Sequence, residues 1–173
     1  MEGGYIVMKQ TVLSLLVENT SGVLSRVAGL FSRRGYNIDS LTVGVTKDPN
    51  FSRMTVAVTG DDQIIEQIKK QLEKLEDVIE ISELEDGKSV CRELVLVKVQ
   101  ADKKEKQELI ATAGVFRANI VDVAPNSLMI ELTGNQNKIE AFLDLLEGFE
   151  IQQIVRTGVT GLSRGSFLKE TNE

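Results

Sequence analysis

Apolar residues near the start of the chain follow two different periods. Side chains alternate from Thr11 to Val17, with Leu13 and Leu15 on one face, which is typical of a β-strand. From Val23 to Phe31 apolar residues recur at three- and four-residue spacing, which predicts an amphipathic helix that ends near Gly35. The pattern then predicts strands over 37–46, 53–59 and 78–84, and a second helix that begins at Asp61 or Asp62.

The same order of elements recurs after the polar connector at residues 85–88. The second set consists of strands over 93–100, 119–123, 127–133 and 150–155 and helices over 103–116 and 135–146. Each set is a β-α-β-β-α-β unit. The sequence therefore predicts an α+β protein with two tandem ferredoxin-like units. The expected boundaries are residues 9–85 and 86–157, followed by a C-terminal tail over 158–173.

Each unit should form an antiparallel sheet with both helices on one face. The other face, or an edge of the sheet, then needs cover, which pairing with a second sheet would provide. We therefore expect the chain to form a homodimer.

Composition excludes several classes of partner. The chain has 173 residues, of which 42% are hydrophobic and 27% charged, and its net charge is −6. It contains no block of basic residues, so nucleic acid and anionic membrane surfaces are poor candidates. It also contains no apolar run of roughly 20 residues, the length that spans a bilayer.

Missing residue types limit the chemistry further. The chain has no histidine, and Cys91 is its only cysteine. Imidazole general bases, Ser-His-Asp and Cys-His nucleophiles and His/Cys zinc sites are therefore excluded within this chain. Because a lone cysteine forms no internal disulfide, the composition suits the cytoplasm. Phosphate-binding glycine loops are also missing from the sequence.

The turn at Asn19–Gly22 is the leading candidate for a binding site. It joins the first predicted strand to the first helix, where unpaired backbone N–H groups and the helix dipole favour an anion. The carboxamide of Asn19 can donate and accept beside that point. These groups suit the carboxylate and ammonium of a free amino acid. The alternative is a structural turn in which Ser21 caps the helix and Gly22 permits the bend.

A second polar segment follows the first helix. Arg33 and Arg34 suit the negative end of the helix dipole, and Gly35 suits the position that ends the helix. Asn37 is either a turn residue or a recognition group. In this layout Asn37 and Ile38 lie at the opposite end of the helix from Asn19. One copy therefore cannot easily bring both asparagines to one small ligand, whereas a two-fold partner can.

Several blocks of the sequence closely resemble the acetolactate (acetohydroxyacid) synthase small subunit. The resemblance is nearly collinear from about residue 9 to residue 166. Its most specific parts are the Gly35-Tyr36-Asn37-Ile38 block and the Leu162-Ser163-Arg164-Gly165 tail, whereas the first turn alone would indicate only a generic ACT domain. The remaining matching blocks lie at residues 19–34, 39–43, 52–55, 67–75, 92–94, 116–123 and 156–161.

The resemblance implies an N-terminal ACT domain, a C-terminal ferredoxin-like domain and no catalytic activity in this chain. Such a subunit has no cofactor of its own and associates with a catalytic large subunit that uses thiamine diphosphate, FAD and magnesium. It activates that enzyme of branched-chain amino-acid biosynthesis and confers feedback inhibition, usually by valine. The alternative is a free-standing ACT-domain amino-acid sensor that regulates a different metabolic enzyme.

The resemblance also implies which residues bind the effector at the interface between two ACT domains. One chain would contribute Asn19, Ser21, Gly22, Val23 and Leu24, and its partner would contribute Asn37 and Ile38. Val23 and Ile38 would supply a small apolar pocket. The second unit has Asp102-Lys103-Lys104-Glu105 in place of the first turn, so no effector site is expected there.

Overall fold

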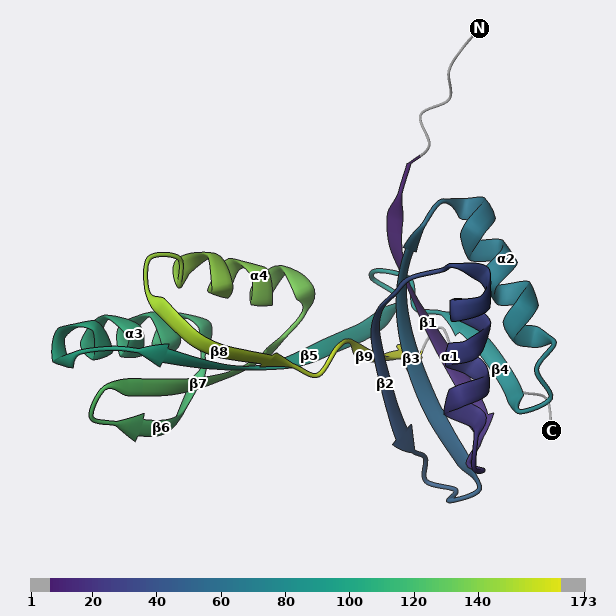
Figure 1. The fold of residues 1–173 in the computed structure, drawn as a ribbon, viewed down its shortest axis with the longest axis horizontal. Helices are drawn as coiled ribbons and strands as arrows, with labels where there is room; N and C mark the ends of the chain where they lie inside the picture. The colour runs from purple at the N-terminus through teal and green to yellow at the C-terminus, as the bar shows by residue number, and fades with distance from the viewer. Residues whose placement is uncertain (1–6, 166–173) are drawn as a thin grey trace, which may run out of the picture. The chain divides into compact units, whose positions relative to one another are not determined.

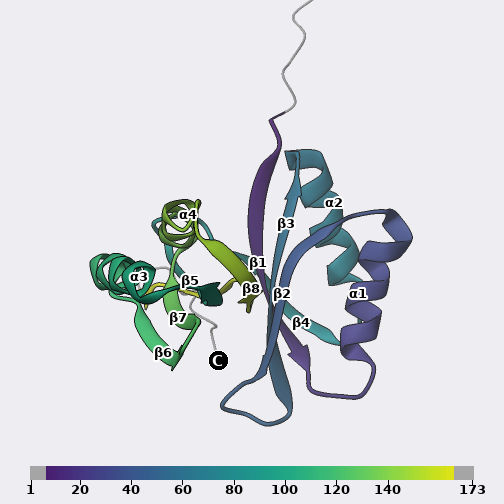
Figure 2. The same ribbon diagram turned by 60° about the vertical axis from the view of Figure 1, so that its left-hand side comes forward.

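The structure is a computed structural model that describes residues 7–165. The chain forms two compact units (Figures 1 and 2). The first contains the residues up to Val90 together with the segment that starts at Val159, and the second is Cys91–Gly158. The sequence divided the chain after residues 85 and 157. The compact units divide it after residues 90 and 158 and place the segment from Val159 with the first unit.

The first unit is a four-stranded antiparallel sheet with two helices on one face (Figure 1). Its strands lie in the order β2-β3-β1-β4. The elements are β1 (Lys9–Glu18), α1 (Val23–Arg34), β2 (Ile38–Val45), β3 (Phe51–Gly60), α2 (Asp62–Glu73) and β4 (Val78–Glu83). This is the predicted β-α-β-β-α-β order.

Alternation along the central strands directs their apolar residues toward the helices. Leu13 and Leu15 of β1 are fully buried, and their sheet partners on β3, Val56 and Met54, are buried beside them. The helices contribute the buried side chains of Val23, Val27, Phe31, Ile65, Ile68 and Leu72 to the same cluster. This burial supplies the main stabilisation of the unit.

The second unit repeats the arrangement. Its sheet has the order β6-β7-β5-β8, and β9 pairs with β5 outside this path. The elements are β5 (Ser89–Gln100), α3 (Lys103–Phe116), β6 (Asn119–Ala124), β7 (Ser127–Gly134), α4 (Gln136–Leu145) and β8 (Glu150–Arg156), whereas β9 (Thr160–Ser163) lies in the segment that belongs to the first unit. The α+β fold of two tandem ferredoxin-like units is therefore confirmed.

Packing in the second unit follows the same principle. Val95 and Val97 of β5 are fully buried against Leu109 of α3 and Phe142 of α4. The ring of Phe116 meets that of Phe142 edge-on, with centroids 5.4 Å apart. Because the core contacts come from both helices, α3 and α4 lie on one face of the sheet. No helix within residues 7–165 is long and apolar enough to cross a membrane.

The segment that follows the second unit returns to the first. The Val159 N–H donates to Ser40 Oγ at 3.2 Å, and Thr42 Oγ1 donates to the Val159 carbonyl at 3.2 Å. Farther along, the Arg164 N–H donates to the Lys88 carbonyl at 2.9 Å. The Leu162-Ser163-Arg164-Gly165 tail is therefore hydrogen-bonded as far as Arg164.

Candidate functional site

The turn after β1 lies at one end of the first unit's sheet. At this end Val17 of β1 pairs with Ser52 of β3, and Ser52 pairs in turn with Val45 of β2. Both β1 and β2 are antiparallel to β3, so the two strands run in the same direction. The turn at residues 19–22 therefore lies at the sheet end where β2 finishes.

Gly22 is the N-cap of α1, and no side chain caps the helix. Ser21 is therefore not the N-cap that the structural alternative proposed. Gly22 has φ 87°, a left-handed conformation that L side chains rarely adopt. The backbone N–H groups of Leu24 and Ser25 donate to no described residue. The start of α1 thus offers N–H donors at the positive end of the helix dipole.

Asn19 is fixed by contacts with the turn between β2 and β3. Its backbone N–H donates to the Asn50 carbonyl at 2.7 Å. Its side-chain Nδ2 donates to the Pro49 carbonyl at 2.9 Å. The amide is thereby oriented, and its Oδ1 accepts no hydrogen bond from residues 7–165. This oxygen can accept a hydrogen bond from an ammonium group.

The apolar residues of the turn differ in what they can offer. Val23 is only 3% exposed and belongs to the core beneath α1, so it contributes to a ligand through its backbone. Leu24 is 47% exposed, and Ser21 is also exposed. Val45, the last residue of β2, is 62% exposed. Leu24 and Val45 are therefore apolar side chains that remain available at this end of the unit.

Asn37 and Ile38 lie at the opposite end of the same sheet. Ile38 begins β2 and pairs with Val58 of β3, which pairs with Thr11 near the start of β1. Asn37 is exposed, whereas Ile38 is partly buried against the core. Within one chain these two residues are therefore separated from the Asn19 turn by the length of the sheet.

Arg26 is a residue of this region that the sequence did not single out. Its Nε donates to Asp77 Oδ2 at 2.5 Å, and this hydrogen bond raises the pKa of the guanidinium. A Cβ placed on Gly22 would lie 2.9 Å from Arg26 Nη1. The guanidinium therefore adds positive charge beside the start of α1. The spacing of four residues between Gly22 and Arg26 was the available signal, because such residues share a helix face.

The corresponding turn of the second unit is closed by its own side chains. Asp102 caps α3 and accepts hydrogen bonds from the N–H groups of Lys104 and Glu105, both at 2.8 Å. Glu105 Oε2 accepts from the Asp102 N–H, which completes a capping box. The donors that are open in α1 are thus occupied in α3.

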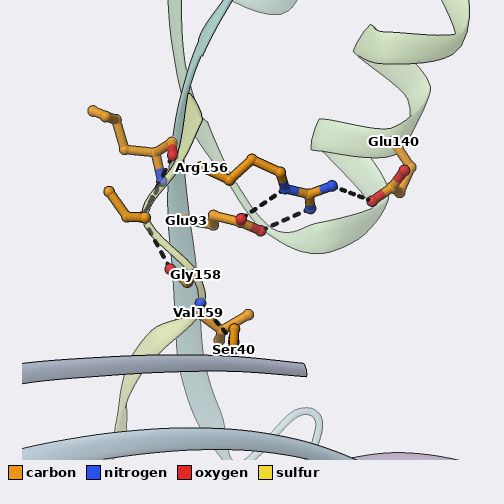
Figure 3. A network of polar contacts seen from close by, with 8 residues as sticks. Ser40, Glu93, Glu140, Arg156, Gly158 and Val159 are labelled. Atoms are coloured by element: carbon orange, nitrogen blue, oxygen red, sulfur yellow. Dashed lines mark hydrogen bonds and ion pairs between the residues drawn. The ribbon is translucent and has the colours of Figure 1, made fainter. Parts of the chain in front are cut away.

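An ionic cluster around the buried carboxylate of Glu93 in the second unit has a structural explanation. Glu93 is 5% exposed and accepts two hydrogen bonds from Arg156, which also contacts Glu140 (Figure 3). The guanidinium holds the pKa of Glu93 below its ordinary value. A carboxylate engaged in this way is a poor general base. Within residues 7–165, no three His, Cys, Asp or Glu side chains are grouped closely enough to hold a metal ion.

Two family models together match most of the chain. One, described as an "AHAS small subunit-like ACT domain", matches residues 13–80. The other, described as "Small subunit of acetolactate synthase", matches residues 92–165.

Individual proteins show the same similarity along nearly their whole length. The chain is 51% identical over 156 residues to a "Probable acetolactate synthase small subunit" from Methanothermobacter thermautotrophicus, covering 90% of this chain and 93% of the relative. It is 50% identical over 155 residues to the "Acetolactate synthase isozyme 3 small subunit" of Escherichia coli, covering 89% and 95%. A crystal structure of the small subunit from Thermotoga maritima superposes with a TM-score of 0.82 at 41% identity, covering 90% of this chain and 98% of that one.

Proposed function

Because this chain belongs to the acetolactate synthase small subunit family, we propose that it is the non-catalytic regulatory subunit of an acetolactate synthase in branched-chain amino-acid biosynthesis. It activates a catalytic large subunit in the cytoplasm and confers feedback inhibition by valine. The observation that carries the proposal is the turn from Asn19 to Leu24. There, open N–H donors at a helix start accompany an oriented amide oxygen.

The two charged groups of valine match the two kinds of donor and acceptor in this turn. The carboxylate accepts from the N–H groups of Leu24 and Ser25, where the helix dipole and Arg26 favour negative charge. The ammonium donates to Oδ1 of Asn19. Because Gly22 lacks a side chain, a ligand can approach the backbone closely.

A homodimer supplies the rest of the site. β2 is an edge strand, and its Val43 and Val45 are 47% and 62% exposed. In an antiparallel pairing of β2 with its copy, the start of the partner strand lies beside the end of the first. Asn37 and Ile38 of the second copy would then approach the Asn19 turn of the first. The ligand therefore links two subunits and favours one arrangement of the pair.

The catalytic partner carries the cofactors in this proposal. Thiamine diphosphate, FAD and magnesium belong to the large subunit, and this chain contributes only regulation. Coupling between the valine site and the partner of about 1–3 kcal/mol would change activity roughly 5–150-fold.

Gly22→Asp tests the site. Aspartate strains the left-handed backbone and places a negative charge where the valine carboxylate binds. Gly87→Asp is the matched control, because Gly87 has φ 77° and open space around its Cα but lies outside the turn. The readouts are valine titration by calorimetry and valine inhibition of the assembled enzyme.

We expect Gly22→Asp to assemble and activate normally but to resist valine, and Gly87→Asp to remain sensitive. Full valine inhibition of Gly22→Asp would exclude this turn as the valine-binding site. A chain that binds valine but does not associate with the large subunit would instead indicate a free-standing ACT sensor of another enzyme.

A further inference from the structure

A surface cavity of about 280 Å³ lies between α1 and the end of α2 in the first unit. Arg26, Leu30, Arg33 and Arg34 of α1 form one wall. Gln71, Lys74 and Leu75, at the end of α2 and just beyond it, form the other. Figure 2 shows the two helices side by side on the sheet. The lining contains four cationic side chains and no carboxylate, although the chain as a whole has a net charge of −6.

Three of these cations have no counter-ion in the described part of the chain. No carboxylate among residues 7–165 forms an ion pair with Arg33, Arg34 or Lys74. Arg26 is paired with Asp77 through Nε, while its two terminal nitrogens donate to no described residue. Like charges that line one cavity repel one another unless an anion joins them.

Helix-end electrostatics accounts for only part of the cluster. Cations near the end of α1 favour the helix dipole, but Arg33 and Arg34 make no hydrogen bond to a described carbonyl. The carbonyls of Ser32 and Phe31 in the last turn of α1 are bonded by the backbone, since they accept from the N–H groups of Gly35 and Tyr36. Arg26 lies near the start of α1, where the dipole disfavours a cation.

We propose that this cavity binds a small phosphorylated organic anion. Guanidinium groups match phosphate oxygens with paired N–H donors, and the Lys74 ammonium adds a point charge. The Leu30 and Leu75 side chains, both partly buried against the core, provide an apolar surface for the organic part. The Gln71 amide can hydrogen-bond a hydroxyl group. The volume suits a small molecule, and the net charge of −6 argues against nucleic acid.

Calorimetric titration of the full-length protein tests this site. The probes are inorganic pyrophosphate, glycerol 3-phosphate and, as a carboxylate anion of similar charge, citrate. The variants Arg33→Gln, Arg34→Gln and Lys74→Gln each remove one cation. Lys47→Gln removes an exposed lysine from the β2–β3 turn of the same unit and is matched for net charge. Arg34→Lys keeps the charge but loses the paired donors.

We expect saturable binding of both phosphates at one site per chain. Each cavity variant should weaken it about tenfold or more, and Lys47→Gln should change it less than twofold. Arg34→Lys should fall between Arg34→Gln and the unmodified protein. An equal loss in Lys47→Gln, or no saturable binding of either phosphate, would overturn the proposal. Citrate binding as tight as pyrophosphate would overturn the phosphate class. Circular dichroism of each variant confirms that the fold is retained.

Discussion

The carboxylate of Glu93 accepts two hydrogen bonds from the guanidinium of Arg156, at 2.8 Å from Nε and 2.9 Å from Nη2. Arg156 ends β8 and Glu93 lies on β5, so the pair joins two strands across 63 residues of sequence. Nearby, the Thr157 N–H donates to the Leu94 carbonyl at 3.1 Å. These contacts fix the backbone where the chain leaves the second unit (Figure 3).

Glu93→Gln should lower the free energy of unfolding by about 1.5–3 kcal/mol, since a charge-assisted pair is replaced by a weaker one and Arg156 loses its buried counter-ion. The control is Glu140→Gln, which removes the other carboxylate on Arg156. The Glu140 side chain is 49% exposed, so its loss should cost no more than about 1 kcal/mol. Urea denaturation measures both, and equal losses would contradict a special role for Glu93.

Stability should also depend on pH through Glu93. Hydrogen bonds from Arg156 lower its pKa in the folded protein from the ordinary 4.5, so folding favours the charged form. The stabilisation is complete above the unfolded pKa and is lost as the pH falls through the lower folded pKa. Melting curves between pH 7 and pH 3 should therefore show the original protein and Glu93→Gln converging at low pH. A constant difference in melting temperature would refute this explanation.

Replacing glycine by alanine should change the stability of the protein in opposite directions at two helix positions. Gly35 ends α1 with φ 69°, so Gly35→Ala should lower stability by about 1 kcal/mol although no atom obstructs the new methyl group. Gly114 lies within α3 at an ordinary φ, again with open space around it. Gly114→Ala should raise stability by about 0.5–1 kcal/mol. Thermal melting of the two variants, which add the same group, checks the contrast.

Removing the cap of α3 should be costly. Asp102→Ala loses the acceptor for two N–H groups and should reduce the free energy of unfolding by about 1–2 kcal/mol. Asp102→Asn retains an acceptor at the same position and should recover part of the loss. Chemical denaturation compares both variants with the unmodified protein, and an Asp102→Ala curve identical to that of the unmodified protein would show that the capping box contributes nothing measurable.

Asn19→Ala should weaken valine binding about tenfold or more if the amide oxygen accepts from the ammonium. The matched control is Asn50→Ala, whose Nδ2 donates only to Asp48 of the neighbouring turn. Calorimetry with valine measures both variants. Unchanged affinity in Asn19→Ala would remove this residue from the proposed site, whatever the effect of Gly22→Asp.

Local periodicity predicted most of the fold. The strand from Phe51 to Gly60 buries Met54, Val56 and Val58, as their alternation indicated. The predicted second helix is α2, which buries Ile65 and Ile68 on one face. These elements follow from the sequence because the residues that define them lie within a few positions of one another.

Features that depend on distant residues were not predicted. The strand β9 is only four residues long and forms by pairing with β5. No periodic pattern of apolar residues therefore predicted it. The Arg26–Asp77 and Glu93–Arg156 pairs join side chains 51 and 63 residues apart. Nothing local in the sequence indicated that Asp77 reaches α1.

The sequence predicted which residues form the candidate site better than it predicted their geometry. The sequence located the turn and the asparagine, and the structure added the hydrogen bonds that orient Asn19. The N-cap was assigned to Ser21 in the structural alternative, whereas Gly22 occupies it. Capping preference favours serine, but the left-handed backbone at this position requires glycine.

The first unit is built from two stretches of chain, and the whole second unit lies between them in sequence. A ribosome releases the chain from its N-terminus, and domains generally fold as units during synthesis. The segment from Val159 therefore emerges only after Cys91–Gly158 has been made. Translation gives the second unit time to fold while the first still awaits its last strand. The N-terminal unit is thus begun first and completed last.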